Sequence, residues 1–378
     1  MKADDEYRGR EQSGLKHRIL HDYLSSWAQK LGSAADRLWY VDCFAGPWGT
    51  ESEDFHDTSV AIGLDSLRAA SAAHRIPISA VFVEKDPKAF KRLKAWLGTS
   101  GTTADCHVLQ GSFGDHCGAI DALIGRDPAF ILVDPCGWKG ADMSLIATLG
   151  GKRRRDLLIN FMHNFINRAK GMMGHHEWLR EQMLDFFGPA AIDVNSATTE
   201  DELIGIYKAE LKRRAGLRFV ADCAILNPKL DRTWFRLVVA GQHEKVVELF
   251  REVEAKVCGI DAAEVRSKAK ESGSSQMSLG LGGQTHEGHY VRVNRLAREL
   301  ARRGLLAAVD GGKKPRWSDV WPEIIEAQHL TLRNLHEVVA EMEAAGALTL
   351  AGRPSGKRVP TPDTTLAAGS SRSGSKIR

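Results

Sequence analysis

Short apolar runs alternate with stretches of helical periodicity over the first two thirds of the chain. A leading amphipathic pattern runs from Leu15 to Trp27 and stops at Gly32. Strand-like apolar runs follow at 38–43, 78–84, 105–110, 129–134 and 156–161. Apolar residues recur at helical spacing between them, at about 57–72, 86–97, 115–125 and 140–149. This alternation predicts a doubly wound parallel α/β sheet with helices on both faces.

The last two apolar runs of this region are too close together for a crossover helix. After a helix-rich stretch at about 174–214, strand-like runs at 218–226 and 233–240 flank a short turn. One of these strands must therefore be antiparallel to the others. We expect a Rossmann-like, seven-stranded sheet of the kind found in class I methyltransferases, followed by a helix at 243–258.

The last quarter of the chain has a different pattern. Gly and Ser dominate residues 269–285, which is typical of a flexible linker. Helical patterns then lead to a candidate recognition helix that begins at Thr331. Apolar residues at 347–350, a Gly-rich turn and residues 357–360 predict a β-wing. The expected divisions are a flexible N-terminus at 1–14, a Rossmann-like domain at 15–268, the linker at 269–285, a winged-helix domain at 286–360 and a disordered basic tail at 361–378.

Composition narrows the function classes without selecting one. The 378 residues carry a formal charge of +4, and from His286 onward fifteen Lys and Arg stand against ten Asp and Glu. A nucleic-acid contact is therefore expected in the C-terminal part. The six cysteines form no Cys-x-x-Cys pair, which disfavours a disulfide framework or a metal site. Neither a signal peptide nor a membrane-spanning apolar stretch is found, so we expect a cytoplasmic protein without membrane contact.

Two of the apolar runs, those that reach Asp42 and Asp134, end in an acidic residue followed by a turn rich in Gly and Pro. The first turn begins at Asp42, and its small side chains leave room for a cofactor close to the backbone. Glu84 ends the second run, where a carboxylate can accept bonds from both ribose hydroxyls of S-adenosylmethionine (SAM). The candidate cofactor residues are Asp42, Phe44, Ala45, Gly46, Gly49, Glu84, Ser112 and Phe113.

Ser112 and Phe113 follow the third run and have two interpretations. Ser112 lies either at the edge of the adenine or at a turn that it caps, and Phe113 lies either against the adenine face or in the core. A nicotinamide or flavin site is disfavoured, because the chain has no GxGxxG turn with an acidic residue about 20 positions later.

The fourth run ends in the segment Asp134-Pro135-Cys136-Gly137-Trp138, and we take its first four residues as the candidate catalytic loop. Amino-methyltransferases carry an acidic or amide residue followed by Pro at this place. The Asp134 carboxylate and the Pro135 carbonyl would accept bonds from a target NH2 and free its lone pair, and such alignment alone can lower a barrier by several kcal/mol. Trp138 either stacks on a flipped base or packs in the core.

Cys136 permits a different reaction in the same loop. Cytosine C5 methyltransferases place a nucleophilic Cys directly after a Pro here, and their RNA-modifying members have an Asp shortly before it. Those enzymes also need a second acid or Cys after the next strand, where this chain reads Asn160-Phe161-Met162-His163. Cytosine C5 chemistry therefore stays a minor alternative.

Further residues are candidates for contact with nucleic acid. Asn160 and His163, after the fifth run, would line the substrate side of the cleft. The basic stretch before that run forms either a solvated loop or a phosphate contact, and a winged helix binds either nucleic acid or protein. The candidate basic residues are Arg153, Arg154, Arg333, Arg353, Lys357 and Arg358.

The chain resembles the three-Cys-motif partner protein (TcmP) family over residues 15–360. The resemblance rests on Lys16-His17 before an amphipathic helix, on Tyr40-Val41-Asp42-Cys43-Phe44-Ala45-Gly46-Pro47, on Asp134-Pro135-x-Gly137 and on Trp317-Ser318-Asp319-Val320. It implies a methyltransferase-like core with a C-terminal winged helix, bacterial or phage origin, and a companion protein with a cysteine trio. The Asp-Pro-x-Gly form is also similar to that of tRNA guanine-N2 methyltransferases. Trp48 and Cys136 depart from the family, which usually has Gly in the cofactor turn and an aromatic residue in the catalytic loop.

These observations support two hypotheses from different classes. The first is a SAM-dependent methyltransferase that acts on an exocyclic amino group of a nucleic-acid base, DNA or RNA. The second is a non-catalytic or conditionally active partner subunit that uses the winged helix to bring a companion enzyme to nucleic acid. Trp48 favours the second hypothesis, whereas Asp134 and Glu84 favour the first.

Overall fold

The computed structural model describes residues 11–46, 55–172, 175–189, 194, 196–227, 232–262 and 288–369. The described residues form two compact units, one ending at Val253 and the other beginning at Glu254. The predicted linker, and Trp48 and Gly49 in the cofactor turn, lie outside the described residues.

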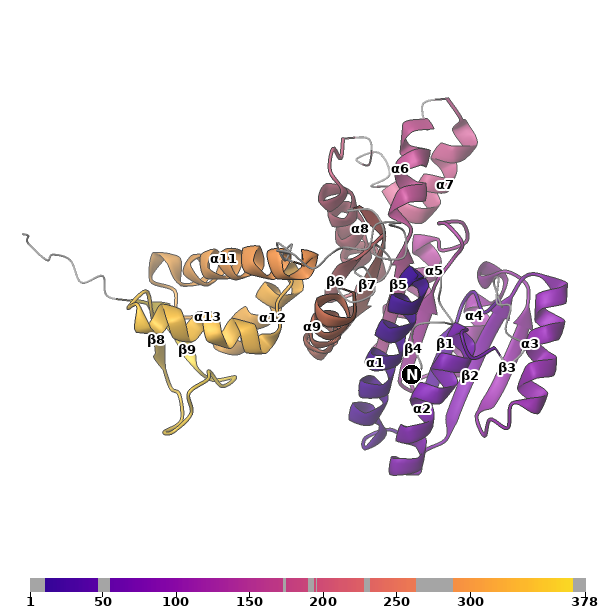
Figure 1. Ribbon diagram of the computed structural model, residues 1–378, viewed down its shortest axis with the longest axis horizontal. Coiled ribbons are helices and arrows are strands. Elements are labelled where there is room, and N and C mark those ends of the chain that lie inside the picture. Colours follow the sequence, from indigo (N-terminus) through magenta and orange to yellow (C-terminus); the bar gives the residue numbers. More distant parts are fainter. Residues whose placement is uncertain are drawn as a thin grey trace, which may run out of the picture. The chain divides into compact units, whose positions relative to one another are not determined.

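The first unit contains a seven-stranded sheet in the order β3-β2-β1-β4-β5-β7-β6 (Figure 1). Its strands are β1 (Leu38–Asp42), β2 (Ile78–Glu84), β3 (Asp105–Gln110), β4 (Ala129–Val133), β5 (Arg155–Phe161), β6 (Phe219–Leu226) and β7 (Thr233–Gly241). Strands β1 to β5 are parallel, and β7 is antiparallel to both β5 and β6. The predicted class I methyltransferase sheet is confirmed, with β7 as its antiparallel strand.

Helices cover both faces of this sheet. They are α1 (Glu11–Gly32), α2 (Ser59–His74), α3 (Pro87–Thr99), α4 (Phe113–Ile124), α5 (Met143–Gly150), α6 (His163–Met172), α7 (Glu177–Phe187), α8 (Glu200–Ala215) and α9 (Lys245–Lys256). Local sequence signals fix several of their starts. For example, Thr199 and Glu202 form a capping box at α8, and Asp86 caps α3, which has Pro at its first position.

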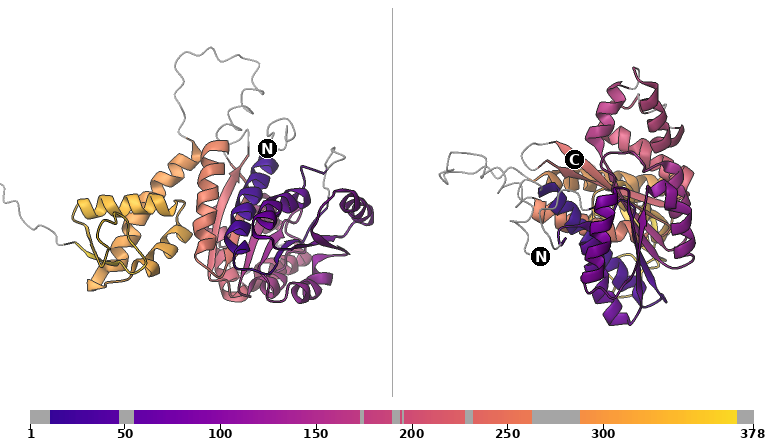
Figure 2. Two further views of the ribbon diagram at one scale, coloured as in Figure 1. Left: turned by 90° about the horizontal axis from the view of Figure 1, so that it is seen from below. Right: turned by 90° about the vertical axis from the view of Figure 1, so that its right-hand side faces the viewer.

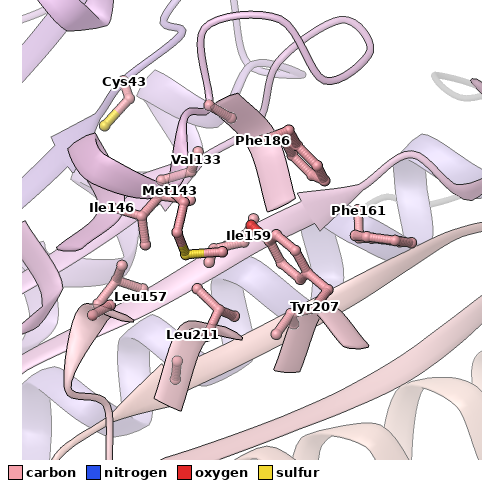
Figure 3. Close-up of a cluster of buried hydrophobic side chains, with 14 of the residues drawn as sticks. Cys43, Val133, Met143, Ile146, Leu157, Ile159, Phe161, Phe186, Tyr207 and Leu211 are labelled. Carbon is pink, nitrogen blue, oxygen red and sulfur yellow. The ribbon is translucent and has the colours of Figure 1, made fainter. Parts of the chain in front are cut away.

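Strand parity decides which side chains meet which helices. The odd-numbered residues Val133, Leu157 and Ile159 belong to one core cluster with Met143 of α5 and Tyr207 of α8 (Figure 3). The even-numbered residues face the opposite way. Helices α1 and α2 lie side by side along this second face (Figure 2).

The second face carries the polar strand ends. Phe130 of β4 packs against Tyr23 of α1, with ring centroids 5.6 Å apart, and against Tyr40 of β1 at 6.3 Å. Because side chains alternate along a strand, Asp42 and Asn160 lie on the same face as these rings. The sheet thus directs the polar residues at its carboxyl edge toward α1.

Among its described residues, the second unit contains three α-helices, two short helical segments (η2 and η3) and a two-stranded antiparallel sheet. Its elements are η2 (Val257–Asp261), α11 (His289–Val309), η3 (Asp310–Gly312), α12 (Trp317–Ala327), α13 (Leu332–Ala344), β8 (Leu348–Ala351) and β9 (Thr365–Ala368). Thr331 caps α13 through a capping box with Asn334, as its position in the sequence predicted. The helices close over a small core that includes Leu305, Val338 and Leu366, each fully buried.

The predicted wing has the wrong return strand. Strand β8 pairs with β9, not with residues 357–360, and an isolated bridge joins Arg316 to Thr365. The physical reason is burial: Leu366 is fully buried, whereas Val359 is 43% exposed beside Pro360, which lacks a backbone N–H. The start of the disordered tail at 361 is therefore also wrong, because residues 361–369 belong to the second unit.

Candidate functional site

Backbone hydrogen bonds join the strand ends at the carboxyl edge of the sheet. Cys43 N donates to Leu132 O at 3.0 Å, and Ala45 N donates to Val83 O at 2.8 Å. Gly111 N, in the turn after β3, donates to Glu84 O at 3.0 Å. The ends of β1 to β4 therefore form one connected edge, which is where open α/β sheets bind ligands.

Asp42 is completely buried and stabilises the turn that follows β1. Its carboxylate accepts bonds from Phe44 N at 3.0 Å and from Ser59 Oγ at 2.5 Å. Burial raises the pKa of Asp42 to about 6, although both hydrogen bonds oppose this change. Asp42 thus positions Phe44, Ala45 and Gly46 and links them to the first turn of α2.

Glu84 lies at the end of β2 and is 3% exposed. One carboxylate oxygen accepts a bond from Asp86 N at 2.6 Å, and burial raises the pKa of the group. A carboxylate has about four lone-pair positions. Glu84 therefore keeps acceptor capacity for a pair of ribose hydroxyls.

The structure supports the simpler interpretations of Ser112 and Phe113. Ser112 caps α4: its Oγ accepts a bond from Asp115 N at 3.3 Å, and the Asp115 carboxylate accepts bonds from Ser112 N and Oγ. Phe113 is 2% exposed and packs edge-on against Phe44. The structure therefore supports a cap for Ser112 and a core position for Phe113, and a contact of either residue with adenine stays a prediction.

Asp134 lies just beyond β4 and is held from two directions. Lys16 of α1 donates to Oδ2 at 2.5 Å, and Asn160 Nδ2 at the end of β5 donates to Oδ1 at 2.6 Å. Burial opposes ionisation of Asp134, but the charge of Lys16 and these two hydrogen bonds outweigh it and lower its pKa. Asp134 is thus a fixed anion whose side chain remains 16% exposed.

The rest of the predicted catalytic loop forms a tight turn. Gly137 N donates to Pro135 O at 2.8 Å, and Gly137 adopts a φ of +124°, which favours glycine. Cys136 is an exposed residue, but its thiol is partly desolvated. This desolvation and the charge of Asp134 raise the pKa of the thiol. A raised pKa disfavours the thiolate that cytosine C5 chemistry requires.

Trp138 packs against the core. Its side chain is half-buried against the cluster around Val133 and Met143, and its indole N–H is buried without a hydrogen-bond partner among the described residues. The structure therefore supports the core alternative for Trp138, and stacking on a flipped base stays a prediction.

The two residues predicted after β5 have different surroundings. Asn160 contacts Asp134 directly and so belongs to the candidate site. His163 Nδ1 lies 3.8 Å from Glu200 Oε2, and burial lowers the pKa of this imidazole. Glu200 also accepts a bond from Arg236 at 2.5 Å, so His163 adjoins a polar network that links α8 to β7.

Arg153 and Arg154 lie at the other edge of the sheet. They precede β5, which runs parallel to β4, so they are at the amino ends of the strands while Asp134 is at a carboxyl end. Arg154 donates to Ala34 O at 2.7 Å, in the segment that leads into β1. Arg153 and Arg154 are therefore not part of the site around Asp134, and a phosphate contact by this pair stays a prediction.

The predicted basic residues of the second unit differ in how free they are. The side chain of Arg333 is 90% exposed and lies 3.6 Å from Glu337. Arg353 instead donates two hydrogen bonds to the Glu343 carboxylate, each 3.0 Å long. Lys357 and Arg358 are exposed in the connection between β8 and β9. Arg353 therefore stabilises the connection between β8 and β9, while the other three present charge to solvent.

Sequence reasoning missed the role of Lys16. The residue was part of the Lys16-His17 signature of the family resemblance, but its pairing with Asp134 spans 118 positions along the chain. The amphipathic pattern of α1 was the available signal, because it predicts a helix that packs on the sheet, and Lys16 lies near the start of that helix.

Two kinds of feature are absent from the described residues. No group of three or more metal-ligating side chains occurs among them, and none of their helices is both long and apolar enough to cross a bilayer.

A cavity of about 410 Å³ lies between α2, the end of α3 and residues 100–104. It adjoins the amino ends of β2 and β3 and is thus separate from the candidate site.

Comparisons with known proteins add little to this site. No family model and no curated protein matches the chain. Similar solved structures include cofactor-bound Rv0187 from MTB, with 13% identity, a TM-score of 0.30 and coverage of 59% of this chain and 79% of the other. A putative caffeoyl-CoA O-methyltransferase from Staphylococcus aureus has 8% identity, a TM-score of 0.30 and coverage of 58% and 82%. M. jannaschii TYW2 in complex with AdoMet has 11% identity, a TM-score of 0.27 and coverage of 56% and 72%. Their activities and ligands are not transferred to this chain, because all three TM-scores are below 0.5.

Proposed function

We propose that this protein is a SAM-dependent methyltransferase that acts on an exocyclic amino group of a nucleic-acid base. The observation that carries the proposal is the ionised Asp134, fixed by Lys16 and Asn160 at the carboxyl end of β4. This place is next to β1, whose terminal turn is the candidate cofactor turn.

The residues at the neighbouring strand ends have suitable chemistry for SAM. Glu84 offers a carboxylate to the ribose, and the turn at Phe44, Ala45 and Gly46 brings backbone groups to the same edge. Asp42 adds negative charge beneath this turn when it is ionised, which favours a cationic ligand. When bound, SAM supplies an electrophilic methyl group on a sulfonium.

Asp134 would orient the amine of the substrate. Its two oxygens each accept one bond in the structure, so lone pairs remain for an N–H donor. The Pro135 carbonyl is bonded to Gly137 N and retains a second lone pair for the same amine. An amine held in this way directs its nitrogen lone pair away from Asp134, and the proton that it loses on methylation passes to the carboxylate that already accepts its hydrogen bond.

The rival hypothesis of a non-catalytic partner subunit differs from this proposal in one measurable property. The methyltransferase must bind SAM, whereas the partner subunit need not. A winged-helix assignment for the second unit suits both hypotheses. A TcmP-type companion protein and a cytoplasmic location are further parts of the proposal.

Isothermal titration calorimetry with SAM and its demethylated product tests the proposal. We expect micromolar binding, and Glu84→Ala should weaken it by about 1.5 to 3 kcal/mol through loss of charge-assisted hydrogen bonds. Asp65→Ala is the matched control, because that carboxylate is 51% exposed on α2 and pairs only across the helix surface. Absence of binding by the folded protein would contradict the cofactor assignment.

A further inference from the structure

Exposed apolar side chains of the first unit gather on two helices. Among its described residues the exposed large apolar side chains are Leu123 at 39%, Phe165 at 40%, Met172 at 47% and Trp178 at 50%. Three of these four lie on α6 and α7, the segment that joins β5 to α8. Local concentration of exposed apolar groups marks an interaction surface.

A positively charged side chain lies close to each of the two exposed aromatic rings, Phe165 and Trp178. The Arg168 guanidinium lies 4.9 Å from the centroid of Phe165, and Lys139 Nζ lies 5.5 Å from that of Trp178. The His176 ring is also 5.9 Å from the indole. Helix α6 contains no Asp or Glu, so this part of the surface offers positive charge together with aromatic faces.

The surface is connected to the candidate catalytic loop. Lys139, which contacts Trp178, follows Asp134 by five residues in the same loop. Helix α6 begins directly beyond β5, whose residue Asn160 contacts Asp134. Figure 1 shows α6 and α7 beyond the end of β5 that leads into them. A chain bound on these rings could thus continue to Asp134.

We propose that Phe165 and Trp178 are stacking positions for an unpaired nucleic-acid strand, with Arg168 and Lys139 contacting its phosphates. Single strands expose base faces, and proteins bind them by combining aromatic rings with positive charge. The bases of a duplex are already stacked on one another, so they cannot stack on Phe165 or Trp178 unless the strands unpair. The inference rests on the proposed function and deepens it, because it assigns an unpaired strand as the substrate class of that site.

Fluorescence anisotropy with labelled oligonucleotides tests the proposal on the full chain. The probes are a mixed-sequence single-stranded 12-mer, its duplex, and a 12-mer of abasic sites with the same backbone. We expect Trp178→Ala and Phe165→Ala each to weaken single-strand binding by about 5- to 150-fold. Leu123→Ala is the matched control, since it removes a comparably exposed apolar side chain from α4 and should leave affinity unchanged.

The abasic probe separates stacking from phosphate contact. It should bind more weakly than the 12-mer, and neither aromatic variant should change its affinity. Lys139→Met and Arg168→Met should instead weaken both probes and reduce the salt dependence by about 0.7 per lost contact. Trp178→Phe should restore most of the affinity lost in Trp178→Ala, which excludes misfolding as the cause.

Photocrosslinking locates the strand independently of the second unit. A 12-mer with 5-iodouracil should crosslink to peptides that contain Phe165 or Trp178. Crosslinks confined to residues 288–369, or single-strand affinity equal in the wild type, Trp178→Ala and Phe165→Ala, would overturn the proposal and assign the exposed rings to a protein partner. SAM binding is measured separately by calorimetry. Failure of the cofactor assignment would appear as absence of SAM binding, whereas failure of the strand site would appear as unchanged single-strand affinity in the Phe165 and Trp178 variants.

Discussion

At the scale of single residues, two carboxylates on one face of the sheet have opposite electrostatic settings. Among the described residues, Asp42 accepts hydrogen bonds from the neutral donors Phe44 N and Ser59 Oγ, and burial raises its pKa to about 6. The side chain of Asp134 is 16% exposed, and the ammonium of Lys16 outweighs the cost of its partial burial and lowers its pKa. Lys16 therefore makes Asp134 the permanent anion of the pair and acts as a positioning residue for the proposed reaction.

Replacement of Lys16 should move the pH profile of methyl transfer. In Lys16→Met, burial acts on Asp134 without a compensating cation, so its pKa rises and the acid limb of the profile moves to higher pH. Activity should fall about tenfold for each pH unit below the new pKa. The measurement is kcat/KM from pH 5 to 9.

Lys16→Arg is the control for this experiment, because it keeps the charge and a hydrogen bond to Asp134. It should retain the acid limb of the wild type. Equal losses at all pH values in both variants would show that Lys16 acts on packing alone, and the positioning role would then be wrong.

Asp42 predicts opposite effects of pH on stability and on cofactor affinity. Its folded pKa of about 6 exceeds the usual 3.8, so between these values the folded state binds more protons than the unfolded state. Stability of the empty protein should therefore fall as pH rises through this window, while affinity for cationic SAM rises as the carboxylate ionises. Asp42→Asn should weaken both dependences in thermal melts and in calorimetry from pH 5 to 7.5. Wild-type pH dependence in the variant would contradict this assignment.

At the scale of secondary-structure elements, hydrophobic periodicity predicted the first unit almost completely. All seven strands and their antiparallel hairpin were expected, because each is an apolar run bounded by turn residues. Strand β9 was missed, since Thr365–Ala368 is a short and weakly apolar segment whose burial depends on Leu366 packing in the second unit. Local pattern cannot report such a tertiary contact.

The candidate site was predictable only as far as strand ends determine it. Asp42, Glu84 and Asp134 could be identified because parallel strands bring their carboxyl ends to one edge. The pairing of Lys16 with Asp134 and the burial of Trp138 could not be, because both depend on how distant helices pack. Exposure of Trp178 likewise follows from the packing of α7, on which its neighbours Leu179 and Met183 are buried.

The contacts of Arg236 lead to a prediction about the stability that α8 gives to the hairpin of β6 and β7. Its guanidinium contacts Glu200, Asp201 and the buried Asp222, at 2.5 to 2.6 Å. Arg236→Met should lower the free energy of unfolding by about 3 kcal/mol, because Asp222 keeps only part of its compensating charge. Urea denaturation measures this, with Arg68→Met, 77% exposed on α2, as the control that should change it by less than about 0.5 kcal/mol. Equal stability of the two variants would mean that the network does not lock the hairpin.

At the scale of the whole molecule, the two units have different electrostatic roles in the proposed function. In the first unit, charged side chains at the carboxyl edge of the sheet are paired with each other, as Lys16 is with Asp134. In the second unit, pairs between α11 and α13 engage Arg298 with Glu337 and Arg302 with Glu341. The basic excess of the C-terminal part is therefore not equally available to a ligand.

The last prediction concerns three exposed basic residues of the second unit, Arg333 on α13 and Lys357 and Arg358 in the connection between β8 and β9. If they contact phosphates, replacing all three by Glu should weaken oligonucleotide binding in the full chain and lower the log-log salt slope by about 2 to 3. SAM affinity should not change, because the cofactor residues belong to the first unit.

The matched control reverses charge at Lys313 and Lys314, which are exposed in the turn before α12. Because nonspecific charge acts through the field of the whole unit, this pair reports the effect of net charge without altering α13 or the connection between β8 and β9. A slope that changes equally per charge in both variants would mean that only net charge matters. Unchanged binding in the triple variant would instead assign the second unit to protein contacts, and the partner-subunit hypothesis would then explain this part of the chain better.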